Sequence, residues 1–413
     1  MPSNQPVQSS AGTVEVQDFY ERYPYPRPID DLDPYKRLWQ DRQRRRADFH
    51  LFWPTRPYRE DLSILIAGCG TSQAAKYALR WPEARVTGID FSATSVRCTQ
   101  ALKRKYSLHN LDIHKLPVER AGELEANFDH IVSTGVLHHL PDPDAGLRAL
   151  RSVLKSDGAM HVMVYATYGR TGIYMLREFC RRVGIQATDE GIREVIVALG
   201  SLPPGHPLCT LLREAPDARD EATLADALLH PQDRAYTVPE LLRFIESNGL
   251  AFDRWVTQAP YSPHCGVMNR IPQFSRQQTH LSLSEEFAAV ELLRGTMARH
   301  SVIVSHSHAA GMRQIRLTGD AFLGYVPIRI PDTICVEEKL PPGAAAVLVN
   351  PRHAYVDLYL PVDARQKRLF QAIDGARTVG EIIHGSESTE FARTFFEQLW
   401  LMDQVVFDAH ERN

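Results

Sequence analysis

The chain has 413 residues, of which 44% are hydrophobic and 23% are charged, and its formal net charge is −3. Because single hydrophobic cores stop growing at about 250–300 residues, this length predicts two domains, or one domain with large additions. The near-neutral charge argues against a global field that recruits nucleic acid or an anionic membrane, and no apolar run reaches the roughly 18 residues of a membrane span.

Cysteine usage and the N-terminal residues predict a cytoplasmic protein. The six cysteines are scattered, with no CxxC pair and no zinc-like spacing, as is usual for reduced cytosolic thiols. The first residues have neither the basic segment nor the apolar segment of a secretory signal. We expect about the first dozen residues to be a disordered tail.

Residues 1–55 are interpreted as this tail followed by an aromatic arm. Pro24, Pro26 and Pro28 exclude a helix across the tyrosine-rich part of the arm. Residues 34–50 then look helical. The arginines between positions 42 and 46 predict a solvated helical face rather than a site for an anion or RNA.

Residues 62–166 alternate short apolar runs with helical segments. This alternation predicts βαβ units and a parallel sheet, and the last helix is expected to end at a glycine cap, Gly158. The predicted strands are residues 62–68, 84–90, 110–117, 128–137 and 159–166, and the predicted helices are residues 71–81, 92–106 and 144–158.

The alternation of strand and helix patterns stops at about residues 170–235. Helical patterns surround a loop at 201–208 there, which predicts a helical insertion. A helix at 237–250, a strand at 251–259, a helix at 285–300 and a strand at 301–307 then resume the sheet, which gives seven strands within a domain spanning residues 56–308. Residues 315–413 change character again. Short β-like runs precede two or three helices there, which predicts a small α+β module.

A glycine turn follows the first predicted strand, in ILIAGCGTSQ. Gly68 and Gly70 allow a tight turn and a close approach of the backbone to a ligand, and the next helix begins with unpaired N–H groups. About 20 residues later, Asp90 ends the second strand, where an acidic residue binds a ribose in nucleotide-binding Rossmann folds. Asp112 and Ile113, in the third strand region, suit an adenine amine and an apolar ring face.

With these pieces in family order and spacing, residues 60–166 resemble class I S-adenosylmethionine-dependent methyltransferases. The matching segments are AGCGTS, GIDFS, LDIHKLP, FDHIVSTGVLHHLPDP and LKSDGAMHVMVY. The resemblance implies a Rossmann-like α/β fold, S-adenosyl-L-methionine as cofactor and methyl transfer. It implies that Ala67, Gly68, Cys69 and Gly70 line the methionine part of the cofactor, that Asp90 binds the ribose, that Asp112 and Ile113 bind the adenine, and that Ser133 and Gly135 lie beneath the sulfonium. Phe91, next to Asp90, is a further candidate cofactor-binding residue.

The chain departs from the family pattern at two positions. Ile66 stands where the family often has an acidic residue, and Ser72 replaces the third glycine of the loop. Both changes still allow the turn. A dehydrogenase is the rival interpretation of a glycine turn with a ribose-binding acid, but it requires the third glycine and gives the LHHLPDP segment no role.

The candidate catalytic residues are His138, His139 and Tyr165. The two histidines follow the fourth strand, where an acceptor should arrive, and imidazole suits a general base near neutral pH. Packing or capping of the next loop is the alternative for either histidine. Tyr165 follows the fifth strand at the same rim, and Asp142 is interpreted as a helix cap.

The candidate substrate residues are more dispersed. Tyr168 and Arg170 could orient an acceptor or anchor the insertion, and His264 could line the acceptor pocket or be structural. Tyr20 and Tyr23 of the arm, with Tyr25, are expected to cover the cofactor, as N-terminal segments do in many class I enzymes. The SHSH segment resembles a metal pair only superficially, so no metal site is predicted.

Residues 315–413 resemble the small peptide-binding chaperone of pyrroloquinoline quinone biosynthesis. The shared pattern is a group of strands, an apolar helix ending in the DGARTVGEI turn at residues 374–382, further helices and a closing strand. Thr378 and Glu381 also have capping-box spacing, so the turn has a purely structural explanation. The resemblance implies recognition of a peptide as an added strand. A structural or dimerising appendage is the alternative.

Three hypotheses follow: a methyltransferase for a small-molecule acceptor, a peptide or protein methyltransferase that recruits its substrate through residues 315–413, and a non-catalytic cofactor-binding scaffold. A nucleic-acid substrate is disfavoured, because no basic patch with interleaved aromatic residues occurs outside residues 42–46. The acceptor, the methylated atom and the oligomeric state are left open.

Overall fold

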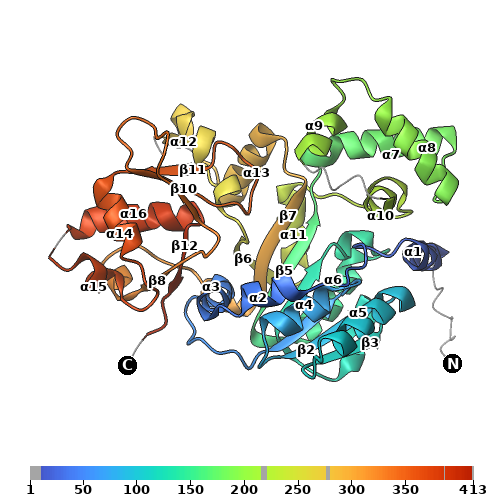
Figure 1. Ribbon diagram of the computed structural model, residues 1–413, viewed down its shortest axis with the longest axis horizontal. Helices are drawn as coiled ribbons and strands as arrows, with labels where there is room; N and C mark the ends of the chain where they lie inside the picture. The colour runs from blue at the N-terminus through green and yellow to red at the C-terminus, as the bar shows by residue number, and fades with distance from the viewer. Residues whose placement is uncertain (1–10, 215–220, 276–279, 386, 412–413) are drawn as a thin grey trace.

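A seven-stranded sheet forms the centre of the computed structural model, which describes residues 11–214, 221–275, 280–385 and 387–411 (Figure 1). The strand order is β3-β2-β1-β4-β5-β7-β6. The strands are β1 (Ser63–Ala67), β2 (Arg85–Asp90), β3 (Leu111–Lys115), β4 (Phe128–Thr134), β5 (Leu154–Tyr165), β6 (Leu250–Trp255) and β7 (Arg299–His306). The predicted Rossmann-like α/β class is confirmed.

Strands β1 to β5 are parallel to one another, and β7 pairs antiparallel with both β5 and β6. The crossovers run through α4 (Gln73–Arg80), α5 (Ala93–Lys105) and α6 (Pro143–Ser152). Parallel strands need such crossovers, and their helices cover the sheet faces, so β1 and β4 are almost entirely buried. The carboxyl ends of the parallel strands, where ligands bind in such sheets, therefore lie at one edge.

The predicted glycine cap of α6 is wrong. The helix ends at Ser152, and residues 154–158 already belong to β5. Leu154 pairs with Phe128, and both side chains are buried in the same core. Burial of this apolar pair outweighs the local helix pattern, because strand extension satisfies backbone groups and removes apolar surface from water together.

The N-terminal arm begins with a helix that the sequence pattern did not predict, α1 (Ala11–Arg22). The expected disorder of the first dozen residues lies mostly outside the described residues, but positions 11 and 12 are helical. The helix predicted at 34–50 is divided into α2 (Asp33–Trp39) and α3 (Arg42–Phe52). The division falls at Asp41, whose carboxylate accepts a hydrogen bond from the backbone N–H of Gln43 and caps α3.

The arginines of α3 are only partly the solvated face that was predicted: Arg42 is exposed, whereas Arg44 and Arg46 bind C-terminal residues. The Arg44 guanidinium donates to the Asp332 carboxylate at 2.7 Å, and Arg46 donates to the carbonyl of Gly375 at 2.6 Å. Arg44 is buried. Nothing in a local charge run reveals such partners, which lie 288 and 329 residues away.

The helical insertion comprises α7 (Thr171–Val183), α8 (Asp189–Gly200), α9 (Pro207–Glu214), α10 (Glu221–Leu224) and a π-helix, Ala225–Leu229. It is drawn in green at the upper right of Figure 1 and has its own apolar core. The chain returns to the sheet through α11 (Val238–Ser247), and α12 (Pro272–Ser275) and α13 (Leu283–Arg294) precede β7. Thr237 caps α11 and forms a capping box with Glu240.

The described C-terminal residues, orange to red in Figure 1, form two small sheets and three α-helices. Strand β8 (Val326–Arg329) pairs with β12 (Val405–Asp408), and β10 (Ala346–Val349) lies between β9 (Ile334–Val336) and β11 (Tyr359–Val362). The helices are α14 (Ala364–Gln371), α15 (Val379–Ile383) and α16 (Thr389–Leu401). The capping box of Thr378 and Glu381 is present at α15.

This C-terminal part has its own core, but β8 and β12 also join the core that includes α3. Ile328, Ile330 and Val406 pack in one buried group with residues of α3 and the sheet. Among the described residues, no helix is long and apolar enough to cross a bilayer.

Candidate functional site

The turn after β1 is held in a conformation that requires glycine. Gly68 has φ +72° and Gly70 has φ +51°. A Cβ added to Gly68 would lie 2.3 Å from Cγ2 of Val136, and one added to Gly70 would lie 3.0 Å from both Cδ of Pro26 and the carbonyl oxygen of Tyr25. The turn therefore allows a close approach by neighbouring backbone, and the segment approaching Gly70 belongs to the N-terminal arm.

Asp90 ends β2 beside this turn, and its carboxylate is buried. One carboxylate oxygen accepts the Gly70 N–H at 2.8 Å and the other accepts the Ser92 N–H at 2.9 Å. Burial raises the pKa of Asp90 to about 6, although the two backbone N–H groups act in the opposite direction. The arrangement couples the glycine turn to a carboxylate at the sheet edge, which is the pairing that the sequence predicted.

The other predicted cofactor residues divide into two groups. Ala67, Cys69 and Ser133 are buried at the ends of β1 and β4, and Gly135 follows with φ +78°. The hydroxyl of Ser133 has no hydrogen-bond partner among the described residues. These positions lie together at the carboxyl edge, because β1 and β4 are parallel neighbours.

Asp112 is not brought to this edge. In the register of β2 and β3, Asp90 is opposite Lys115, whereas Asp112 is opposite Thr87. The Asp112 side chain is 78% exposed and lies 3.4 Å from the Lys103 amine. Ile113 packs at the margin of the core that includes Leu102 and Leu111. The adenine role of this pair stays a prediction that the geometry favours less than the role of Asp90.

The arm crosses the carboxyl edge and is bonded on both sides. The hydroxyl of Thr71 donates to the carbonyl of Pro26 at 2.7 Å, and the Glu21 carboxylate accepts backbone N–H groups at the start of α5. On the opposite side, Tyr23 donates to Asp189 of the insertion at 2.9 Å. The arm thus connects the glycine turn with the insertion.

Tyr20 of the arm links the Asp90 side of the site to the histidines after β4. Its ring meets Phe91 edge-to-face, with centroids 5.9 Å apart, and it also lies 6.4 Å from the His139 ring. Its hydroxyl donates to the Asp226 carboxylate at 2.8 Å. The same carboxylate accepts the Tyr165 hydroxyl at 2.9 Å, so two tyrosines of different segments share Asp226.

A buried polar cluster surrounds these contacts, and we call it the acceptor-side cluster. It brings together four predicted residues and their neighbours from the insertion. Its side chains come from the ends of β4 and β5 and from residues 226–233, which are distant in the sequence but adjacent in space. Its members are His138, His139, Tyr165, Arg170, Asp226, His230 and Asp233.

The rings of this cluster are closely packed, at tilted angles. The His138 ring lies 4.0 Å from the Tyr165 ring, and the His139 ring lies 4.0 Å from the His230 ring. The Arg170 guanidinium stands 3.5 Å above the Tyr165 ring. Burial holds the pKa of His138 and of His230 well below the usual value, so both imidazoles are neutral at pH 7.

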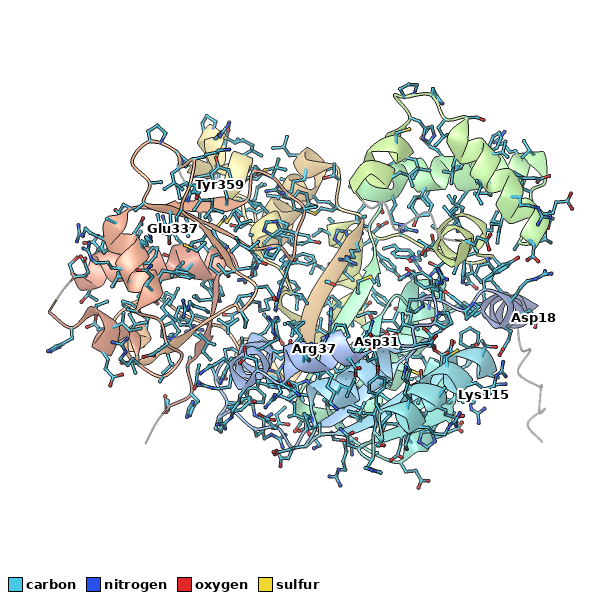
Figure 2. The ribbon with its side chains drawn as sticks, viewed as in Figure 1. Asp18, Asp31, Arg37, Lys115, Glu337 and Tyr359 are labelled. Atoms are coloured by element: carbon cyan, nitrogen blue, oxygen red, sulfur yellow. The ribbon has the colours of Figure 1, made fainter. Side chains whose placement is uncertain are left out.

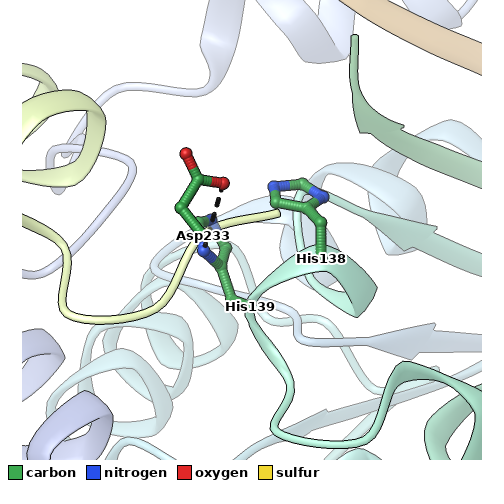
Figure 3. Close-up of side chains that lie close together, drawn as sticks. All are labelled: His138, His139 and Asp233. Atoms are coloured by element: carbon green, nitrogen blue, oxygen red, sulfur yellow. Dashed lines mark ion pairs between the residues drawn. The ribbon is translucent and has the colours of Figure 1, made fainter. Parts of the chain in front are cut away.

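Several polar atoms of the cluster lack a hydrogen-bond partner among the described residues. They include both ring nitrogens of His138, the Nε2 atoms of His139 and His230, and both carboxylate oxygens of Asp233. Figure 3 shows Asp233 beside His139, whose Nδ1 lies 4.0 Å from the carboxylate. Buried polar groups in native proteins are normally satisfied, so this cluster is suited to binding a polar molecule.

Two triplets in the cluster have ligand atoms within 4.8 Å of one another: His138, His139 and Asp233, and His139, Asp226 and His230. The sequence pattern did not predict them, since their members lie on segments separated by about 90 residues. The one local signal was Asp226, an acid within the otherwise apolar run ATLADALLH. A buried acid in such a run needs a partner, and here the partners are two tyrosines.

Two predicted substrate residues lie outside the cluster. Tyr168 is exposed, and the insertion is anchored instead by the buried Arg170. His264 is also exposed. The segment that contains His264 is bonded to the C-terminal residues: the Val267 N–H donates to Asp357, and the Cys265 thiol points to the Leu401 carbonyl.

Residues 65–160 match the family model described as a methyltransferase domain. An uncharacterized protein of Synechococcus sp. is 31% identical over 285 residues, which cover 65% of this chain and 67% of that protein. Trans-aconitate 2-methyltransferase of Deinococcus radiodurans is 31% identical over 137 residues, which cover 33% of this chain and 49% of that enzyme. Among solved structures, PKMT2 from Rickettsia typhi in complex with AdoHcy is similar with a TM-score of 0.61 and 13% identity, covering 89% of this chain and 75% of that one.

The fold and these matches define an S-adenosylmethionine-dependent methyltransferase with the Rossmann-like class I fold. The chain belongs to the same family as the Synechococcus protein. Its cofactor is S-adenosyl-L-methionine. The structural similarity at 13% identity concerns the fold alone, and it extends over the C-terminal residues as well as the sheet.

Proposed function

We propose that this methyltransferase acts on a small-molecule acceptor bound at the acceptor-side cluster, with the methyl donor held by the turn at Gly68–Gly70 and by Asp90. The observation that carries the proposal is the burial, beside the donor edge, of polar atoms without a partner in the described part of the chain, under an arm bonded to the insertion. Enclosure of this kind excludes water and favours a small acceptor over a protein surface.

The reaction is an in-line displacement at the sulfonium methyl. The donor supplies an activated methyl group, so the protein must hold a nucleophile in line with it and exclude water. His138, His139 and Tyr165 are the proposed catalytic residues because they lie at the end of β4 and β5, next to Tyr20 and hence to Phe91. In the neutral state of the buried His138, one ring nitrogen can accept a hydrogen bond from an acceptor molecule and the other can donate one.

Donor binding should depend on pH through Asp90. Only the ionised carboxylate accepts hydrogen bonds from both ribose hydroxyls. With a pKa of about 6, the ionised fraction of Asp90 is about a tenth at pH 5 and about nine tenths at pH 7. We expect the affinity for S-adenosylhomocysteine to rise by roughly tenfold from pH 5 to pH 7 and then to level off. Calorimetric titrations at stepwise pH measure this rise. The Asp90→Asn variant, which cannot ionise at this position, should show a flat profile, and a wild-type profile without a rise contradicts the role of Asp90.

A peptide or protein acceptor is the second candidate, and one observation favours it. Strand β9 is an edge of its sheet, all three of its residues are exposed, and Ile334 is an apolar member of it. Figure 2 shows Glu337, directly after β9, and Tyr359, on the opposite edge strand, at the surface of this part. An exposed edge offers unpaired backbone groups to an added strand. Deleting residues 315–413 is a poor test, because Ile328, Ile330 and Val406 complete the core that includes α3.

Point variants distinguish the two acceptor classes in the full chain. With methyl-labelled S-adenosylmethionine and a cell extract, we expect label in the fraction below about 3 kDa, and we expect Asp226→Asn to reduce it by at least about tenfold, since that change removes the charge shared by two tyrosines. Val336→Lys, on the exposed edge of β9, should change the yield by less than about twofold. Label in the protein fraction that is lost with Val336→Lys and kept with Asp226→Asn would support the peptide acceptor instead.

A further inference from the structure

We propose that His139 and His230 together bind a phenolic hydroxyl group of the acceptor, with Nε2 of His139 taking the hydroxyl proton and Nε2–H of His230 donating a hydrogen bond to the oxygen. This inference rests on the proposed function, because it places the acceptor at the acceptor-side cluster. It adds the chemical class of the acceptor and assigns a role to His230, a residue of the insertion.

The backbone of a single residue, Gln232, sets the two imidazoles in opposite tautomers. Its carbonyl lies 2.8 Å from Nδ1 of His139, so that nitrogen carries the proton and Nε2 has a free lone pair. Its N–H donates to Nδ1 of His230 at 3.0 Å, so that nitrogen has the lone pair and Nε2 carries the proton. The Gln232 side chain also donates to the Leu140 carbonyl at 3.1 Å, which fixes this residue beside the histidines.

The two Nε2 atoms therefore present one acceptor and one donor, and both lack partners among the described residues. His139 and His230 are buried, with exposed fractions of 4% and 2%. A neutral hydroxyl group donates one hydrogen bond and accepts others, so it satisfies both atoms at once. A metal ion does not, because the protonated Nε2 of His230 offers no lone pair for coordination.

The cluster also stabilises the charge that proton transfer creates. When His139 accepts the proton it becomes an imidazolium, and the Asp233 carboxylate lies 4.0 Å from its Nδ1. A ring nitrogen of His139, a carboxylate oxygen of Asp226 and a ring nitrogen of His230 also lie within 4.8 Å of one another. Two carboxylates beside a base favour its protonated form, as the acid does in a catalytic triad.

The step balances in atoms and charge. The acceptor O–H bond breaks as its proton moves to Nε2 of His139, the new O–CH₃ bond forms, and the CH₃–S bond of the sulfonium breaks with its electron pair left on sulfur. The products are a methyl ether, neutral S-adenosylhomocysteine and an imidazolium that later releases its proton to water. Imidazole deprotonates a phenol, whose pKa is about 10, far more readily than it deprotonates an aliphatic alcohol, so we assign a phenolic acceptor.

The tautomers can be read directly in the wild-type protein. In ¹⁵N-histidine NMR spectra, with His139→Phe and His230→Phe used only to assign the signals, we expect His139 protonated at Nδ1 and His230 protonated at Nε2. The same tautomer at both residues would overturn the inference. So would stoichiometric Zn²⁺ binding that replaces the Nε2 proton of His230.

Two probes test the hydroxyl itself. In the presence of saturating S-adenosylhomocysteine, phenol should bind at least tenfold more tightly than anisole, which lacks the hydroxyl proton, and it should shift both Nε2 signals. His230→Phe should remove the preference for phenol, whereas His109→Phe, at an exposed histidine, should retain it. Equal binding of phenol and anisole, with calorimetry still showing S-adenosylhomocysteine bound, would overturn this inference alone, while absence of S-adenosylhomocysteine binding would contradict the proposed donor site.

Discussion

Replacing Asp90 with asparagine is expected to weaken S-adenosylhomocysteine binding by about 100-fold at pH 7.5. A hydrogen bond to a charged group contributes about 1.5–3 kcal/mol, and the carboxylate is proposed to accept two ribose hydroxyls, so a loss of about 3 kcal/mol is a conservative sum. Asparagine has the same shape but presents an NH₂ group toward one N–H donor of the turn or toward a ribose hydroxyl. Isothermal titration calorimetry measures the change.

A matched control is available in the second acid that the sequence singled out. Asp112→Asn makes the same chemical change at a side chain that is 78% exposed and paired with Lys103. Its effect on affinity should be less than about twofold, because the register of β3 keeps it away from Asp90. If Asp112→Asn matched Asp90→Asn, or if Asp90→Asn bound like the wild type, the proposed donor site would be wrong. The melting temperature of each variant reports whether it is folded.

Replacing Asp403 with alanine is expected to lower the free energy of unfolding by about 3–5 kcal/mol. Asp403 is buried after α16, where one oxygen accepts the N–H groups of Gln258 and Ala259 at 2.6 and 2.9 Å, and the other lies 3.3 Å from the Arg254 guanidinium. Burial raises the pKa of Asp403 to about 6 and lowers that of Arg254 to about 10, so both are charged at pH 7. Alanine leaves Arg254 buried without this partner.

Urea denaturation followed by circular dichroism measures this loss. Asp320→Ala, at an exposed acid whose side chain does not cap the adjoining 3-10 helix, should stay within about 0.5 kcal/mol of the wild type. Because Asp403 connects the C-terminal residues to β6 and the following segment, a loss below about 1 kcal/mol would show that this connection contributes little to stability. A separate early transition in the variant would show that the C-terminal part unfolds independently.

The sheet could be predicted from the sequence because its signals lie within short segments of the chain. Each strand and crossover helix between Ser63 and Tyr165 has its own periodicity, and the glycine turn and Asp90 lie at fixed offsets from strands that are themselves short apolar runs. Where local pattern and packing disagreed, packing prevailed. Residues 154–158 extend β5, although they look like the end of a helix, because Leu154 is buried against Phe128.

The acceptor-side cluster could not be predicted in the same way. His138, His139 and Tyr165 were predicted because they follow strands whose carboxyl ends meet at one edge. Asp226 and His230 come from the insertion, whose path over the edge depends on its own apolar core and on its bonds to the arm. A local sequence pattern does not show that a later segment folds back over the edge of the sheet.

The chain by itself determined the class of enzyme, because a strand, a glycine turn and an acid about 20 residues later specify a donor edge through backbone geometry and short-range spacing. Only the tertiary structure decided what lies opposite that edge. Tyr20 and Tyr165 bond to Asp226, and the Gln232 carbonyl bonds to His139, through contacts that span 206, 61 and 93 residues. Such contacts arise from the burial of separate apolar faces against one another, which local sequence does not encode.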